Sequence, residues 1–291
     1  MLKTSGAPVF VSQRGGHDVT AEFTQRFCAG CNSADRPSAL AFDGCDVLLV
    51  HGWLGEVAIR VTGLLDNVSC NQRVLDYLKD QHCAADELGL CSFAPPYRSE
   101  SVCACGEKVA RMIECNPRPV MIVSHSKGCL DTLEALLILQ REGKLGKVAG
   151  WIALQGPFYG AALAESFLGK RSPIGRLRVR MLGADLEGIR DMTETSREGY
   201  MARNATETEK LVRAIPVLCF ASWKTPLCDG YVLTDGQVTP ESALLPGADY
   251  VALGGITHAM PVIGRKYEPF DRVTFTKTLL TMLRDRSAAR H

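Results

Sequence analysis

The sequence contains no long apolar run, so a membrane-spanning helix, which needs about 20 consecutive apolar residues, is not expected. The apolar run of the N-terminal segment covers only residues 9–11, which is too short for the core of a signal peptide. A charge excess is also missing, because 33 basic and 32 acidic side chains, interspersed along 291 residues, leave a net charge of +1. Neither a nucleic acid nor an anionic membrane is therefore expected as a partner.

The sequence also lacks the ligands that would complete a zinc site. Cys28 and Cys31 have the spacing of half such a site, but the chain has no second CxxC and no pair of histidines at helical spacing. Without an export signal, the twelve cysteines are expected to be reduced thiols. These features predict a cytoplasmic protein with no metal and no cofactor.

Short apolar runs alternate with helical periodicity along the chain. Six runs have the length and β-branched content of buried strands, and they cover residues 46–50, 90–94, 120–124, 148–154, 217–222 and 250–253. Helical spacing marks residues 72–81, 107–114, 130–141 and 270–284. This order predicts a single α/β domain over residues 1–291, with a mostly parallel sheet covered by helices on both faces.

Two regions stand outside this alternation. Residues 1–44 show little periodicity and are interpreted as an N-terminal arm or edge decoration. Residues 162–213 are polar and helical, and they interrupt the order of strands and helices. Because open α/β sheets bind ligands beyond the carboxyl ends of their strands, this insertion is predicted to be a helical cap or lid.

The segment SHSKG, residues 124–128, has the setting of a nucleophile elbow. Ser126 follows the strand at 120–124 and precedes a helix that begins near Lys127. So tight a turn requires small residues two positions before and after the nucleophile. Gly128 meets this requirement, and Ser124 stands where glycine is usual. Serine is small enough for the turn to remain possible.

A serine nucleophile needs a histidine to accept its proton and a carboxylate to orient that histidine. His258 is the histidine that lies after the elbow in a loop beyond a strand, in GGITHAMPV. Loops after the strand at 217–222 offer two acids, Asp229 and Asp235. Either acid completes the chain order Ser, Asp, His that is expected of α/β-hydrolases.

The segment VLLVHGWLGE, residues 47–56, is a strand that ends in a glycine, where the backbone can turn toward the nucleophile. The backbone N–H groups of Trp53 and Lys127 are therefore predicted as the oxyanion hole. Trp53, Phe158 and Tyr159 are candidates to line an acyl pocket, and core positions are the alternative for all three.

Several segments together resemble the lipase branch of the α/β-hydrolases, including bacterial triacylglycerol lipases, short-chain esterases and polyhydroxyalkanoate depolymerases. These segments are VHGWLG, GEKVARMI, SHSKGCLDTLEAL, WIALQGPFYGAALAE, TDGQVTPESALLPGADYVAL and THAMPV. The resemblance implies the α/β-hydrolase fold with Ser126 as nucleophile, Asp235 as acid and His258 as base. Asp235 is preferred to Asp229 because the sequence after it continues the family pattern. Two departures are Ser124 in place of glycine and Cys129 where a second glycine often follows.

We therefore predict a hydrolase of carboxylic esters that works through an acyl-enzyme. No charge cluster lies near the motifs, so uncharged small-molecule or lipid esters with an apolar acyl chain are the expected substrates. One alternative is a thioesterase, acyltransferase or polyhydroxyalkanoate depolymerase with the same triad. Another is a non-catalytic binding protein that keeps the fold.

Overall fold

The structure, a computed structural model, describes residues 10–14, 16–32, 44–52, 92–93, 100–168, 186–224, 233–262 and 270–290. The predicted helix at 72–81 lies outside these ranges. Within them, no helix is both long enough and apolar enough to cross a membrane.

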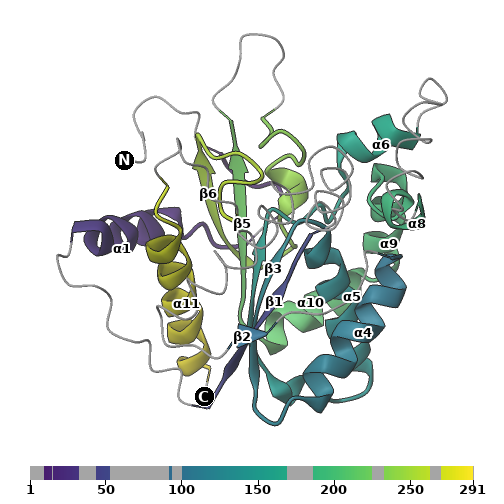
Figure 1. Cartoon of the computed structure of the whole chain (residues 1–291), viewed down its shortest axis with the longest axis horizontal. Coiled ribbons are helices and arrows are strands. Elements are labelled where there is room, and N and C mark those ends of the chain that lie inside the picture. The colour runs from purple at the N-terminus through teal and green to yellow at the C-terminus, as the bar shows by residue number, and fades with distance from the viewer. Residues whose placement is uncertain are drawn as a thin grey trace, which may run out of the picture.

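In the part of the chain that the structure describes, a six-stranded sheet forms the centre, with strand order β2-β1-β3-β4-β5-β6 (Figure 1). All five neighbouring pairs are parallel. The strands are β1 (Asp46–Val50), β2 (Ser92–Phe93), β3 (Val120–His125), β4 (Val148–Leu154), β5 (Val217–Trp223) and β6 (Asp249–Gly254). Each lies on a predicted apolar run, although β2 covers only two residues of its run. The predicted α/β class with a parallel sheet is confirmed.

Both faces of the sheet are buried, which explains why its strands are continuous apolar runs. Successive side chains of a strand point to opposite faces. In β1, Val47 and Leu49 join one buried cluster, and Leu48 and Val50 join the other. The two clusters are the two halves of the core, one on each side of the sheet.

Helices cover the two faces in separate layers (Figure 1). One layer consists of α1 (Thr20–Asn32) and α11 (Arg272–Ala288), whose phenylalanines pack against β5 and against each other. The other contains α4 (Val102–Cys115), α5 (Lys127–Arg141) and α10 (Ala205–Ala214), which contribute to the second cluster. Short 3-10 helices, η1 (Leu145–Lys147) and η2 (Glu241–Ala243), lie in connections.

The predicted insertion at 162–213 is helical in the parts that the structure describes. It contains α6 (Ala162–Leu168), α8 (Leu186–Arg190) and α9 (Glu194–Arg203), and it ends within α10. Asp191, just after α8, accepts a hydrogen bond of 2.7 Å from the backbone N–H of Val102 at the start of α4. This contact attaches the insertion to the helix layer beside the elbow.

Within the segment 1–44, which was interpreted from the sequence as an arm or edge decoration, residues 20–32 form the helix α1. Phe23 in this helix is fully buried and contacts Phe27 and Phe275, with ring centroids 5.6 Å apart in both pairs. Asp18 accepts a hydrogen bond from the N–H of Thr20 and so caps the helix start. The apolar stripe consists of only a few residues over two turns, which is too short to stand out as periodicity.

Candidate active site

Ser126 lies in a sharp turn between β3 and α5. Its backbone has φ 56° and ψ −129°, and Gln155 (φ 52°) is the only other non-glycine residue with positive φ in the described ranges. Such a conformation costs about 1–3 kcal/mol. Two backbone hydrogen bonds hold the turn. The N–H of Ser126 donates to the carbonyl of Leu154 at 3.0 Å, and the N–H of Cys129 donates to the carbonyl of Ser126 at 2.9 Å.

Two glycines allow the end of β1 to approach this turn closely. A Cβ atom on Gly52 would lie 2.7 Å from the Cβ of Ser126, and one on Gly128 would lie 2.5 Å from the carbonyl oxygen of Val50. Real Cβ atoms do not come this near to other heavy atoms. The glycines of VHGW and SHSKG are therefore needed because two backbone segments meet at the serine.

Ser124, which occupies the position where glycine is usual, fits the turn without a positive φ. Its hydroxyl accepts a hydrogen bond of 2.8 Å from the indole N–H of Trp151 and donates one to the sulfur of Cys129 at 3.2 Å. The Cys129 thiol in turn contacts the carbonyl of Leu154, and burial raises its pKa. The two departures from the lipase pattern thus contact each other and provide a partner for a buried tryptophan.

The structure brings Ser126, His258 and Asp235 together in one buried chain of hydrogen bonds. His258 Nε2 lies 2.9 Å from Ser126 Oγ, and His258 Nδ1 lies 2.7 Å from Asp235 Oδ2. A carboxylate only accepts, so Nδ1 carries the proton and Nε2 is free to accept from the serine hydroxyl. The three residues follow β3, β5 and β6, whose carboxyl ends share one edge of the sheet.

Backbone groups hold Asp235 in place. Its Oδ1 accepts hydrogen bonds from the N–H groups of Gln237 and Val238, at 2.9 and 2.8 Å, which leaves Oδ2 to face His258. The carbonyl of Asp235 also accepts a hydrogen bond from the backbone N–H of His258. The alternative acid, Asp229, lies outside the described residues.

Two polar residues near His258 were not predicted from the sequence. His125 Nε2 lies 2.9 Å from the backbone carbonyl of His258, and the two rings are 4.8 Å apart. Burial and then the positive charge that His258 can carry lower the pKa of His125 to about 3. Gln155, after β4, is fully buried and contacts the carbonyl of Thr257. The only sequence signal was that both residues directly follow or end predicted strands.

Lys127 is the first residue of α5, so its backbone N–H has no acceptor within the helix and lies at the positive end of the helix dipole. Its side chain is fully buried, and its Nζ forms an ion pair with Asp131 at 2.7 Å. Burial opposes the charged form of Lys127, but Asp131, together with the nearby Cys105 and Asp191, more than offsets this effect, so the pKa of Lys127 is raised. Trp53, the other predicted oxyanion donor, lies outside the described residues.

The predicted aromatic lining is only partly accessible. Phe158 is fully buried and packs edge-on against Trp151, with centroids 5.8 Å apart, which agrees with the alternative of a core position; its assignment to a substrate pocket stays a prediction. Tyr159 is half-buried, and the guanidinium carbon of Arg14 lies 3.2 Å from its ring centroid. The assignment of Tyr159 to a substrate pocket stays a prediction.

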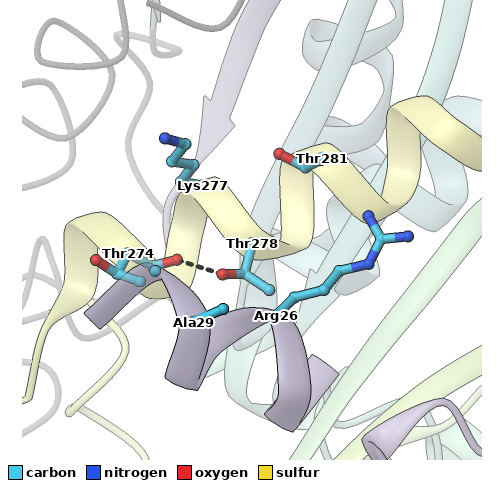
Figure 2. A pocket seen from close by; sticks show the side chains of 7 residues that line it. Arg26, Ala29, Thr274, Lys277, Thr278 and Thr281 are labelled. Carbon is cyan, nitrogen blue, oxygen red and sulfur yellow. Dashed lines mark hydrogen bonds between the residues drawn. The ribbon is translucent and has the colours of Figure 1, made fainter. Parts of the chain in front are cut away.

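Two pockets lie away from the hydrogen bonds that join Ser126, His258 and Asp235. Figure 2 shows one of about 390 Å³ between α1 and α11, where Thr278 donates to the backbone of Thr274 within α11. Another, of about 440 Å³, lies between α4, α5 and α9. Neither is lined by Ser126, Asp235 or His258. Within the described ranges, no group of three or more potential ligands could hold a metal ion.

Comparisons with known proteins point to one fold. No protein-family profile matches the sequence, and no curated protein shows significant sequence similarity to it. A metagenomic carboxyl esterase has a similar structure, with a TM-score of 0.72 at 15% identity over 96% of this chain and 97% of the esterase. The chain has the α/β-hydrolase fold.

A second α/β-hydrolase structure supports the same fold. The mature form of the Bacillus licheniformis lipase BlEst2 gives a TM-score of 0.54 at 16% identity, over 85% of this chain and 94% of the lipase. In this fold the elbow serine stands at the carboxyl edge of the sheet, which is where Ser126 lies. The predicted α/β-hydrolase fold is thus confirmed.

Proposed function

We propose that the protein hydrolyses carboxylic esters, with Ser126 as nucleophile, His258 as general base and acid, and Asp235 as the group that orients His258. The observation that carries this proposal is the buried chain from Ser126 Oγ through the His258 ring to Asp235, with bonds of 2.9 and 2.7 Å. A strained serine backbone in the same turn supports it, because such strain clusters at functional sites.

In the proposed reaction, Ser126 Oγ attacks the ester carbonyl carbon while His258 Nε2 accepts the hydroxyl proton. The backbone N–H of Lys127 stabilises the oxyanion, and a lost donor of this kind typically costs about 10²–10³ in kcat. The bond to the alcohol oxygen then breaks as His258 returns the proton to that oxygen. Water, deprotonated by His258, attacks the acyl-enzyme and releases the carboxylic acid and free Ser126.

The proposed substrates are uncharged esters with an apolar acyl chain. Two of the solved structures with a similar fold, those compared above, are a carboxyl esterase and a lipase, which favours this class. The insertion at 162–213 is proposed as the cap above the site. A thioesterase or acyltransferase would use the same three side chains, so a series of p-nitrophenyl esters measured against acyl-CoA substrates distinguishes these activities.

Labelling with a fluorophosphonate probe tests the nucleophile. We expect the wild type and a Ser287→Ala control on α11 to be labelled, and Ser126→Ala to be unlabelled and inactive. Folded wild-type protein that does not react with the probe would overturn the proposal and favour the non-catalytic alternative.

Substitution of the acid tests the choice between Asp235 and Asp229. Asp235→Asn keeps the shape of the side chain but favours the wrong tautomer of His258, so we expect kcat to fall about 10⁴-fold. Asp229→Asn should leave kcat near the wild-type value. The reverse pattern in ester-hydrolysis kinetics would show that Asp229 is the acid.

A further inference from the structure

The backbone around His258 is held by side chains from the central strands. His125, the last residue of β3, has its Nε2 2.9 Å from the carbonyl oxygen of His258. Gln155, the first residue after β4, donates from its side-chain amide to the carbonyl oxygen of Thr257 at 3.2 Å. Two consecutive carbonyl groups of the histidine loop therefore have partners on neighbouring strands.

The donors in both contacts follow from simple chemistry. A carbonyl oxygen can only accept, so Nε2 of His125 carries a proton and the ring is bound through it. The second amide hydrogen of Gln155 is directed to the hydroxyl of Ser222, at 2.5 Å, which fixes the amide from β5 as well. The backbone N–H of His258 donates to the carbonyl of Asp235 at 3.1 Å. Both the backbone N–H and the backbone carbonyl of His258 therefore form hydrogen bonds.

This anchoring matters because His258 lies in a loop after β6 and must keep two short bonds at once. A ring on a loop is placed only as well as the backbone beneath it, and sites are most accurate when rigid elements support them. The strands β3 and β4 are adjacent in the centre of the sheet, so their ends provide that rigid support.

The structure maintains this arrangement despite unfavourable features. Gln155 is fully buried with a positive φ, and surrounding contacts must maintain such a conformation. His125 is buried beside a ring that becomes a cation in the proposed reaction. Burial and that neighbouring charge lower its pKa, so His125 is neutral at pH 7 and adds no repulsion to the cation.

We propose that His125 and Gln155 are positioning residues that hold the carbonyls of His258 and Thr257 and thereby set the reach of the His258 ring to Ser126. This role rests on the proposed function, because it is defined by the reaction that His258 carries out.

Four variants test the proposal by steady-state ester hydrolysis. His125→Leu and Gln155→Met remove the donors at similar volume, and a misplacement of about 1 Å is enough to lower kcat by about 100-fold. We expect kcat to fall about 10- to 100-fold in each, with KM little changed. His125→Gln, whose amide nitrogen reaches nearly as far as Nε2, should restore most of kcat. Thr278→Val, which removes a buried hydroxyl on α11, is the control and should keep the wild-type kcat.

The double variant gives a second kinetic test. Since both side chains act on one loop, His125→Leu with Gln155→Met should lose clearly less than the product of the two single losses. If His125→Leu does not fold, Gln155→Met and His125→Gln still decide the question. A wild-type kcat in folded His125→Leu and Gln155→Met would overturn the proposal.

A readout that does not depend on activity is the downfield proton resonance of His258 Nδ1–H, which reports its bond to Asp235. We expect this resonance to shift or broaden in His125→Leu and Gln155→Met, and to remain unchanged in Thr278→Val. An unchanged resonance in both donor-deleted variants contradicts the positioning role. If wild-type protein fails to react with the fluorophosphonate probe while the resonance shifts as expected, the proposed function fails and the structural anchoring stands.

Discussion

The buried ion pair between Lys127 and Asp131 allows a sharp test of how the elbow helix is stabilised. Both side chains have at most 2% of their surface exposed, and Lys127 Nζ lies 2.7 Å from Asp131 Oδ1. Replacing Asp131 with leucine leaves a buried ammonium group without its closest carboxylate. Breaking a buried pair in this way costs about 3–5 kcal/mol. Total domain stability is about 5–15 kcal/mol, so Asp131→Leu should be marginally stable.

Removing both charges should have a very different effect. In the double variant Lys127→Met with Asp131→Leu, neither charge has to leave water, and the free energy of unfolding should lie within about 1 kcal/mol of the wild type or above it. The proposed oxyanion donor is the backbone N–H of Lys127, which methionine keeps. The double variant should therefore also retain ester hydrolysis.

Urea unfolding with linear extrapolation measures these free energies, at constant pH near neutrality. The pKa of Lys127 is raised in the folded state. The stabilisation that the charged Lys127 gains from its ion pair with Asp131 is therefore complete below about pH 10.4, the pKa of an unperturbed lysine, and is lost as the pH rises through the folded-state pKa. A loss below about 1 kcal/mol in Asp131→Leu would refute the reasoning. So would a double variant as unstable as the single one.

Three further substitutions test the surroundings of the site. Ser124→Gly restores the usual elbow residue but leaves a buried indole N–H without its acceptor, so urea unfolding should show a loss of about 1–3 kcal/mol with kcat retained; equal stability would contradict this role. Gly52→Ala places a methyl group against Ser126 and should lower kcat about 10- to 100-fold. The control Gly146→Ala, whose new Cβ meets no neighbour, should keep the wild-type kcat. Equal kcat values in the two variants would count against the close approach of Gly52 to Ser126. Folded His125 is neutral down to about pH 3, whereas the unfolded residue gains a proton near pH 6.5. As the pH falls through this range, the free energy of unfolding of the wild type should therefore decrease by about 1.4 kcal/mol per pH unit relative to His125→Gln. Parallel curves of stability against pH for the two proteins would refute the lowered pKa.

The substitution at Ser124 shows how a motif can change without losing its geometry. Glycine is usual there because the turn is crowded, yet the serine hydroxyl lies between Trp151 and Cys129 and forms hydrogen bonds with both. The polar groups of Ser124, Trp151 and Cys129 are therefore paired with one another inside the core. The altered elbow is explained by local packing, and it gives no support to a loss of activity.

Local sequence pattern was enough to predict most of the sheet and the helices α4, α5 and α11. Strands and helices differ in the spacing of their apolar residues, and this spacing is visible in a single sequence. The helix α1 was missed because its apolar stripe is short, and its Phe23 is recognisable as a core residue only once it meets Phe275 in α11. That contact joins residues about 250 positions apart in the chain.

By itself, the sequence determined the α/β class and a candidate set of Ser126, His258 and either Asp229 or Asp235, because chain order and strand ends can be read from spacing and motif. The resemblance to lipases favoured the set Ser126, Asp235 and His258. Only the tertiary structure decided that these three side chains meet within hydrogen-bonding distance. It also decided that His125 and Gln155 hold the loop of His258. The physical reason is that parallel pairing of β3, β4, β5 and β6 brings distant loops to one edge of the sheet, and contacts between such loops leave no periodic signal in the residues that make them.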